Sequence, residues 1–270
     1  MVAFRIIFEI LAFVLGASFG SFAALVAYRL PKGISIIKPD SYCTSCQKPI
    51  KPIDNIPVLS WIILKGKCRY CNAKIGVFSL IMEICGGLGF MLTYLEYGVT
   101  LKTLPIVVSL LALIFLFLIM AAIDYETHEI YNITLVLFAI IAVFVSIYRI
   151  LLFNESFIQH LLGLVLGVCF FGTIKLVSKI ITKRNALGSG DVYLVGIGGL
   201  MLGAFPLLIA ILIATFSGSV IELTKIKLGK SEREVEIAFG PYLLFGIGIM
   251  AIYGDAFMNY YWEVFINALI

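Results

Sequence analysis

The chain has 270 residues, of which 61% are hydrophobic and only 13% are charged. Soluble proteins carry about 25% charged residues, and a soluble chain of this length could not bury so much apolar surface. The mean hydropathy of +1.08 indicates that the excess faces lipid, so soluble globular folds are excluded. The net charge of +4 is small and gives no support for nucleic-acid binding.

Uncharged runs long enough to cross about 30 Å of hydrocarbon predict transmembrane helices. Five such runs lie at 10–28, 75–95, 103–123, 130–148 and 157–174, the second interrupted by an acidic residue. The uncharged run 192–221 is too long for one span and is broken by glycines and Pro206, so we expect two short helices there and a final span over 237–254. The sequence predicts an all-α membrane protein with about eight transmembrane helices.

The first run could be a secretory signal peptide, but such a peptide carries its positive charges before the apolar run. Here Arg5 is offset by Glu9, and the dense basic stretch begins after the run, at Arg29. We therefore expect the run to remain as the first transmembrane helix, with the N-terminus outside.

Lys and Arg residues are distributed unevenly over the predicted loops. Sixteen fall in segments assigned to the cytoplasm, at 29–74, 179–184 and 225–233, whereas the loops assigned to the outside have Lys102 and Arg149. Positive residues favour the cytoplasmic side of a membrane, which supports this topology. We expect three parts: a first helix (1–28), a cytoplasmic loop (29–74) and a seven-helix membrane domain (75–270).

Two Cys-x-x-Cys pairs lie in the cytoplasmic loop, Cys43 with Cys46 and Cys68 with Cys71. Each pair can bind one side of a tetrahedral zinc ion. Two disulfides are the alternative, but cytoplasmic thiols are kept reduced. We predict a structural zinc ion, because four thiolates leave no open position at which the metal could activate water.

Acidic residues within or at the ends of membrane spans are costly, so each needs a reason. Asp124 ends the third apolar run and Asp191 begins the sixth, which places both at cytoplasmic helix ends. They are either unrelated, with Asp191 an N-cap, or a pair in which one ionised carboxyl activates water and the other donates a proton to a peptide carbonyl. In a pair, Gly188 and Gly190 would let a peptide backbone approach Asp191.

Two further acids are candidates for a substrate path. Glu83 falls about midway along the second run, and Glu222 ends the seventh span. Either residue could instead hydrogen-bond within the helix bundle.

The chain resembles the type IV prepilin peptidases, a family within the intramembrane aspartic proteases that carry a Gly-x-Gly-Asp motif. The resemblance runs nearly end to end and rests on these segments: Gly20-Ser21-Phe22, Tyr28-Arg29-Leu30-Pro31, the cysteine loop with its Asn55-Ile56-Pro57-Val58-Leu59-Ser60, Ile123-Asp124, Gly188-Ser189-Gly190-Asp191 and Phe239-Gly240-Pro241-Tyr242.

The resemblance implies an endopeptidase of the bacterial inner membrane that removes basic leaders from prepilins and pseudopilins at the cytoplasmic face. It implies that Asp124 and Asp191 are the catalytic pair and that the four cysteines bind zinc. Many members also methylate the new N-terminus with S-adenosyl methionine, an activity associated with members that retain the four-cysteine loop. The alternative is an ion-coupled transporter with a regulatory zinc loop, which would place its acids near mid-bilayer, in inverted repeats.

Overall fold

The computed structural model of the chain describes residues 2–182, 188–229 and 238–266. It divides into two compact units, 1–123 and 124–270, and each is described by itself. The three-part division made from the sequence stays a prediction. Four of the basic residues that support the topology, and the predicted start of the last span at 237, lie outside the described residues: Lys183, Arg184, Lys230 and Arg233.

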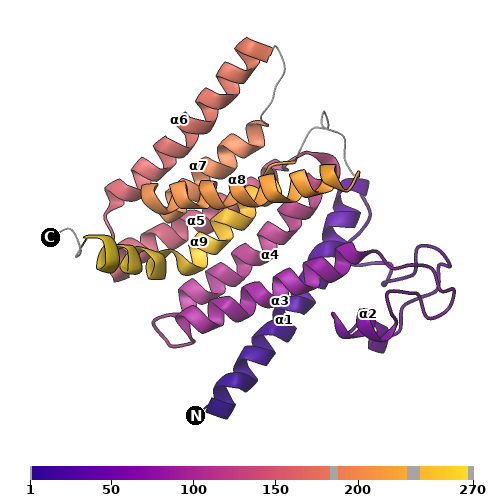
Figure 1. Cartoon of the computed structure of the whole chain (residues 1–270). Coiled ribbons are helices and arrows are strands. Elements are labelled where there is room, and N and C mark those ends of the chain that lie inside the picture. Colours follow the sequence, from indigo (N-terminus) through magenta and orange to yellow (C-terminus); the bar gives the residue numbers. More distant parts are fainter. Residues whose placement is uncertain (1, 183–187, 230–237, 267–270) are drawn as a thin grey trace. The chain divides into compact units, whose positions relative to one another are not determined.

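The first unit is built on two closely packed helices, α1 (Val2–Arg29) and α3 (Val77–Tyr97), followed by most of α4 (Leu104–Thr127). Figure 1 shows α1 crossing α3. A Cβ atom at Gly16 would overlap the carbonyl oxygen of Gly86. The two backbones therefore touch, as small residues allow between membrane helices.

The loop between α1 and α3 carries only short helices: η1 (Leu30–Lys32), η2 (Pro52–Asn55) and α2 (Leu59–Ile63). The buried guanidinium of Arg29, at the end of α1, donates hydrogen bonds to the carbonyl oxygens of Ser35 and Pro39, at 3.0 and 2.8 Å. These hydrogen bonds hold the start of the loop against the end of α1.

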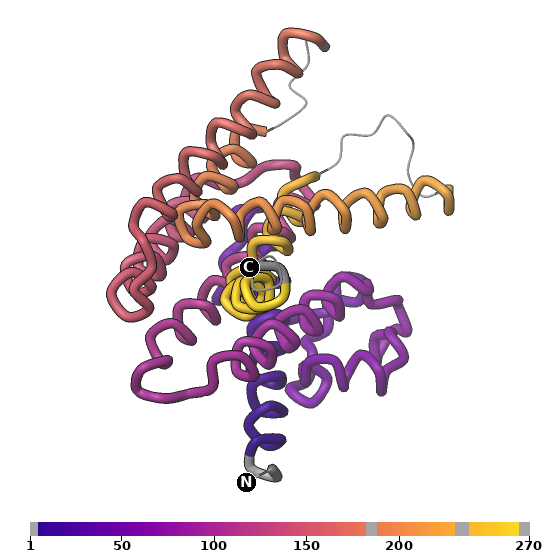
Figure 2. Tube along the Cα trace, turned by 60° about the vertical axis from the view of Figure 1, so that its left-hand side comes forward, coloured from indigo at the N-terminus to yellow at the C-terminus, as the bar shows by residue number. Residues whose placement is uncertain are grey.

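The described residues of the second unit form the last turn of α4 and five further α-helices: α5 (Asn132–Phe153), α6 (Phe157–Thr182), α7 (Ser189–Leu202), α8 (Ala204–Lys227) and α9 (Gly240–Tyr261). A short π-helix, η3 (Trp262–Ile266), follows α9. The shortest helix, α7, contacts the other four, and Leu194 and Val195 on it are fully buried. Both views show α6 and α7 side by side (Figures 1 and 2). The core of this unit is therefore centred on α7.

Seven of the described helices are long and apolar enough to cross a membrane, and α7, with 14 residues, is a shorter apolar helix. The prediction of an all-α membrane protein is confirmed. One detail was wrong: 192–221 was expected to hold two short helices, but α8 has 24 residues. Pro206 lies in the first turn of α8, where proline is tolerated, and the chain breaks instead at Gly203, whose φ is +84°.

Candidate functional site

The second unit brings Asp124 and Asp191 to one position. Asp124 lies in the last turn of α4 and Asp191 in the first turn of α7. A Cβ atom on Gly240, the first residue of α9, would lie 2.5 Å from Oδ2 of Asp124 and 3.6 Å from Oδ1 of Asp191. Both carboxyls therefore face the side of Gly240 on which a Cβ would lie, although Asp124, Asp191 and Gly240 are far apart in the sequence.

The surroundings of this pair suit proton transfer. The Asp124 side chain is only 5% exposed, and none of the described residues gives its Oδ2 atom a hydrogen bond of ordinary geometry. Two neighbouring carboxyls in a poorly hydrated site do not readily ionise together, and such a pair can share one proton. Such a pair can take a proton from water and give one to a carbonyl oxygen.

The residues before Asp191 adopt a helix start in which Gly188, and not Asp191, is the N-cap. The capping role considered for Asp191 is therefore wrong. A Cβ atom at Gly190 would lie 3.0 Å from the side chain of Ile130, and one at Gly188 would lie 3.3 Å from Oδ2 of Asp191. Both glycines are thus packed against neighbours, and their part in a substrate path stays a prediction.

Glu222 lies near the end of α8, within a polar network. It accepts hydrogen bonds at one carboxylate oxygen from the Tyr242 hydroxyl (2.6 Å) and the Lys225 ammonium (2.7 Å). The Lys225 ammonium also lies 5.3 Å from the ring centre of Tyr125, next to Asp124. The network thus connects Tyr125, the residue after Asp124, with Tyr242, which lies two residues beyond Gly240.

In the first unit, the four cysteine sulfurs of the loop lie within 4.8 Å of one another, and those of Cys43 and Cys71 are 3.8 Å apart. Sulfurs bound at about 2.3 Å to a tetrahedral zinc ion stand about 3.8 Å apart. The two Cys-x-x-Cys pairs form the same kind of turn. Gln47 follows the first pair with a φ of +57°, and Asn72 follows the second with a φ of +58°. Each donates its backbone N–H to the carbonyl oxygen of the first cysteine of its pair. All four are free thiols, and together they could bind a metal ion.

The electrostatics of this cluster favour a bound cation. Backbone N–H groups of Cys46 and Ser45 lower the pKa of the Cys43 thiol to about 6. The Ala73 N–H favours the Cys71 thiolate, but desolvation and the three other cysteines raise the pKa of Cys71 to about 11. Four neighbouring thiolates repel one another, and a divalent metal removes that repulsion.

Glu83 lies in the second turn of α3, closer to the loop than the middle of the span where the sequence placed it. Its carboxylate accepts hydrogen bonds from the Ser21 hydroxyl (2.8 Å), the Ser79 hydroxyl (3.3 Å) and the backbone N–H of Val58 (2.7 Å). It therefore connects α1, the loop and α3 within the first unit.

Sequence reasoning missed a second polar cluster, at the end of α7 that lies away from Asp191. The guanidinium of Arg149 is buried and pairs with Asp255 (2.8 Å) and Glu155 (3.3 Å). The ring of His160 lies between the Glu155 carboxylate (3.0 Å) and the Leu200 carbonyl oxygen (2.9 Å). The sequence analysis treated Arg149 only as a charge in a loop. Its place at the end of an apolar helix was the one sign in the sequence that it could have a buried partner.

Gly240 and Tyr242 were also given no role of their own. The sequence offered them only within the segment Phe239-Gly240-Pro241-Tyr242. A glycine immediately before a proline at a helix start gave no indication of which side chains it faces.

Two family models match the chain. The bacterial peptidase A24 N-terminal domain matches residues 14–97, and the type IV leader peptidase family matches residues 111–223. The first match covers the cysteine loop with α1 and α3, and the second contains both paired aspartates.

Curated relatives named prepilin leader peptidase/N-methyltransferase resemble the chain over most of its length. The protein from Klebsiella pneumoniae is 33% identical over 205 residues, which cover 71% of this chain and 83% of the relative. The Bacillus subtilis protein is 27% identical over 249 residues, 92% of this chain and 96% of the relative. The Neisseria gonorrhoeae protein is 29% identical over 266 residues, 86% of each chain. No solved structure matches the chain.

Proposed function

Because this chain belongs to the type IV leader peptidase family, we propose that it cleaves the basic leader from type IV prepilins or pseudopilins, with Asp124 and Asp191 as its catalytic acids. The observation that carries the proposal is the convergence of both carboxyls on Gly240. Two carboxyls that share one proton are what peptide hydrolysis by an aspartic protease requires.

Each carboxyl has a distinct part in the reaction. The ionised one takes a proton from a water molecule, whose oxygen attacks the carbonyl carbon of the scissile peptide. The protonated one donates to the carbonyl oxygen, which relieves the charge that develops there. When the tetrahedral intermediate breaks its C–N bond, the departing amine receives a proton from the pair, and a hydroxyl of the intermediate returns one to the pair as the new carboxyl group forms. The pair therefore again holds one proton for the next cycle.

Replacing either acid by its amide tests the proposal. Asp124→Asn and Asp191→Asn should each reduce cleavage of a purified prepilin by roughly 10²–10⁴-fold, because an amide cannot take the proton that the reaction moves. Glu126→Gln, an exposed neighbour on α4, is the matched control and should cleave at the wild-type rate. Near-normal cleavage by either Asn variant would reject the assignment.

We propose further that Cys43, Cys46, Cys68 and Cys71 bind a structural zinc ion, supported by four sulfurs within 4.8 Å of one another. The names of the relatives support a second activity, N-methylation of the new amino terminus. When bound, S-adenosyl methionine supplies a methyl group made reactive by its sulfonium charge. The chain's own part is to hold the amine of the cleaved polypeptide and exclude water around it.

The protein is a multi-pass membrane protein. We propose that it resides in the bacterial inner membrane, in contact with lipid and without a nucleic-acid partner. The N-terminus would lie outside, with the cysteine loop and the paired aspartates at the cytoplasmic face. Support comes from the concentration of Lys and Arg in the loop between α1 and α3, since positive residues favour the cytoplasm.

An ion-coupled transporter is not favoured. Its acids would be expected near the middle of broken helices, whereas Asp124 and Asp191 lie in the terminal turns of theirs. The relatives are named as peptidases and methyltransferases.

A further inference from the structure

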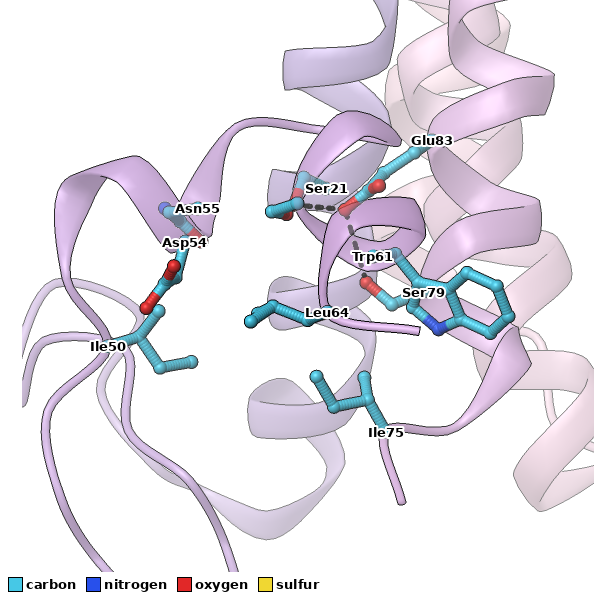
Figure 3. Close-up of a pocket in the computed structure, with 10 residues that line it drawn as sticks. Ser21, Ile50, Asp54, Asn55, Trp61, Leu64, Ile75, Ser79 and Glu83 are labelled. Atoms are coloured by element: carbon cyan, nitrogen blue, oxygen red, sulfur yellow. Dashed lines mark hydrogen bonds between the residues drawn. The ribbon is translucent and has the colours of Figure 1, made fainter. Parts of the chain in front are cut away.

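A small pocket of about 110 Å³ lies in the first unit, where the loop meets α1 and α3. Figure 3 shows the Glu83 carboxylate joined to Ser21 and Ser79, with Asp54 and Asn55 across the pocket from it. The neutral hydrogen-bond donors around Glu83 fix the direction of its carboxylate. No part of the proposed peptide cleavage uses this pocket.

Within the described part of the chain, the charge of Glu83 is not balanced by a basic side chain. Glu83 is only 8% exposed, and the hydrogen bonds that its carboxylate accepts from described residues come from two hydroxyls and one peptide N–H. Among the residues that the structure describes, no Lys, Arg or His forms an ion pair with it. A buried carboxylate without a cation is costly, and a cationic ligand would remove that cost.

The second acid of the pocket is already neutralised. Asp54 accepts hydrogen bonds from Nε of Arg69 at 3.0 and 2.7 Å, and this guanidinium holds the pKa of Asp54 below its usual value. Asp54 therefore adds polarity to one wall but no uncompensated charge. Glu83 alone gives the pocket its charge preference.

The size and lining of the pocket limit what can enter. A cavity of about 150 Å³ holds benzene, so 110 Å³ accepts a head group of a few heavy atoms and excludes a nucleoside. The indole of Trp61 contributes an aromatic surface, which attracts cations further.

We propose that this pocket binds a small organic cation, an alkylammonium or a sulfonium, with Glu83 as its counter-charge. The choice of ligand rests on the proposed methyl transfer, in which both reactants carry such a head: the amino terminus of the cleaved polypeptide and the sulfonium of the methyl donor. The remainder of either molecule would stay outside the pocket.

Binding to the full-length protein in lipid nanodiscs tests the proposal. The chain has two tryptophans, so a Trp262→Phe background makes the fluorescence of Trp61 report on the pocket. One titration compares S-adenosyl methionine with S-adenosyl homocysteine, which lacks the sulfonium charge. The other compares a short apolar peptide bearing a free amino terminus with its N-acetylated form.

In at least one titration, the cation should bind roughly tenfold or more tightly than its neutral analogue, as expected for a charge-assisted contact. Glu83→Gln should abolish that preference. Glu96→Gln, an exposed acid on the same helix, should keep it. The titration that shows the preference identifies which reactant occupies the pocket.

A wild-type protein without preference in both titrations, or a preference that survives Glu83→Gln, would overturn the proposal. If Glu83→Gln does not fold, Leu64→Phe replaces it, because a larger side chain at this lining position fills the pocket and leaves the hydrogen bonds of Glu83 in place. Undiminished cation binding by Leu64→Phe would also overturn it. Leader cleavage and methylation by the wild-type preparation are measured separately, so that failure of the enzyme function is distinguished from failure of the pocket.

Discussion

Gly240→Ala is the sharpest perturbation of the paired aspartates, because it adds one methyl group and changes no charge. The new Cβ would lie 2.5 Å from Oδ2 of Asp124, whereas ordinary van der Waals contact begins at 3.4 Å. The carboxyl must therefore move by about 1 Å, the difference between those distances. Asp124 is only 5% exposed, so little free space is available for that movement.

A displacement of about 1 Å costs roughly 100-fold in rate when it affects a positioned catalytic group, which corresponds to about 2.7 kcal/mol. We expect Gly240→Ala to reduce the initial rate of prepilin cleavage by about that factor. The assay follows the mobility shift of purified prepilin in detergent, with melting temperatures measured on the same preparations.

Gly254→Ala is the matched control on the same helix, α9. Among the described residues, the nearest neighbour of its added Cβ is the Met250 methyl group, 3.9 Å away. Alanine favours a helix over glycine by about 1 kcal/mol. This variant should cleave at the wild-type rate and melt no lower than wild type. The reasoning is refuted if folded Gly240→Ala cleaves within about threefold of wild type.

Two further predictions concern the metal and the stability of the second unit. Purified protein should contain about one zinc ion per chain, and replacing Cys68 and Cys71 together by Ser should remove it, as measured by atomic emission; unchanged metal content would reject the site. Although burial raises the pKa of Glu155, the hydrogen bond with His160 and the charge of Arg149 hold it below its ordinary value. The ionised Glu155 thus stabilises the fold above the ordinary carboxyl pKa of about 4.3, and this contribution is lost as pH falls through the lower folded value. Glu155→Gln should lose about 1–3 kcal/mol at pH 7 and show a smaller fall in melting temperature between pH 7 and pH 3 than wild type; identical pH profiles would contradict this.

Transmembrane helices could be predicted from the sequence because lipid requires long uncharged segments, but their ends could not. The first run was expected to begin at 10, yet α1 begins at Val2, and α6 continues to Thr182 beyond the expected 174. Helical hydrogen bonds continue into polar residues outside the hydrocarbon, so charge marks the limit of the apolar run and not the limit of the helix.

The partners of the predicted site residues were harder to find. Asp124 and Asp191 could be expected at the same membrane face, because each adjoins a helix end and the basic loops fix the direction of the chain. That both face Gly240 depends on how the last turn of α4, from Asp124 onward, meets the first turns of α7 and α9 within the second unit, which no local pattern encodes. Arg149 is a second example. Counting the charges of the loops placed it in an exposed loop, but it is buried and pairs with Glu155 and Asp255.

The division of the chain into two units separates the two proposed chemistries. The paired aspartates and Gly240 lie wholly within 124–270, whereas the four cysteines and the pocket at Glu83 lie wholly within 1–123. The contacts described above for the paired carboxyls and for the cysteines are each made within one unit. If the new amine is methylated at the surface of the cysteine loop, as we propose, loss of zinc should impair methylation while the peptide bond is still cut. In a coupled assay with labelled S-adenosyl methionine, the variant that lacks both Cys68 and Cys71 should cleave prepilin and release mostly unmethylated product; full methylation by that variant would show that the loop is not needed for methyl transfer.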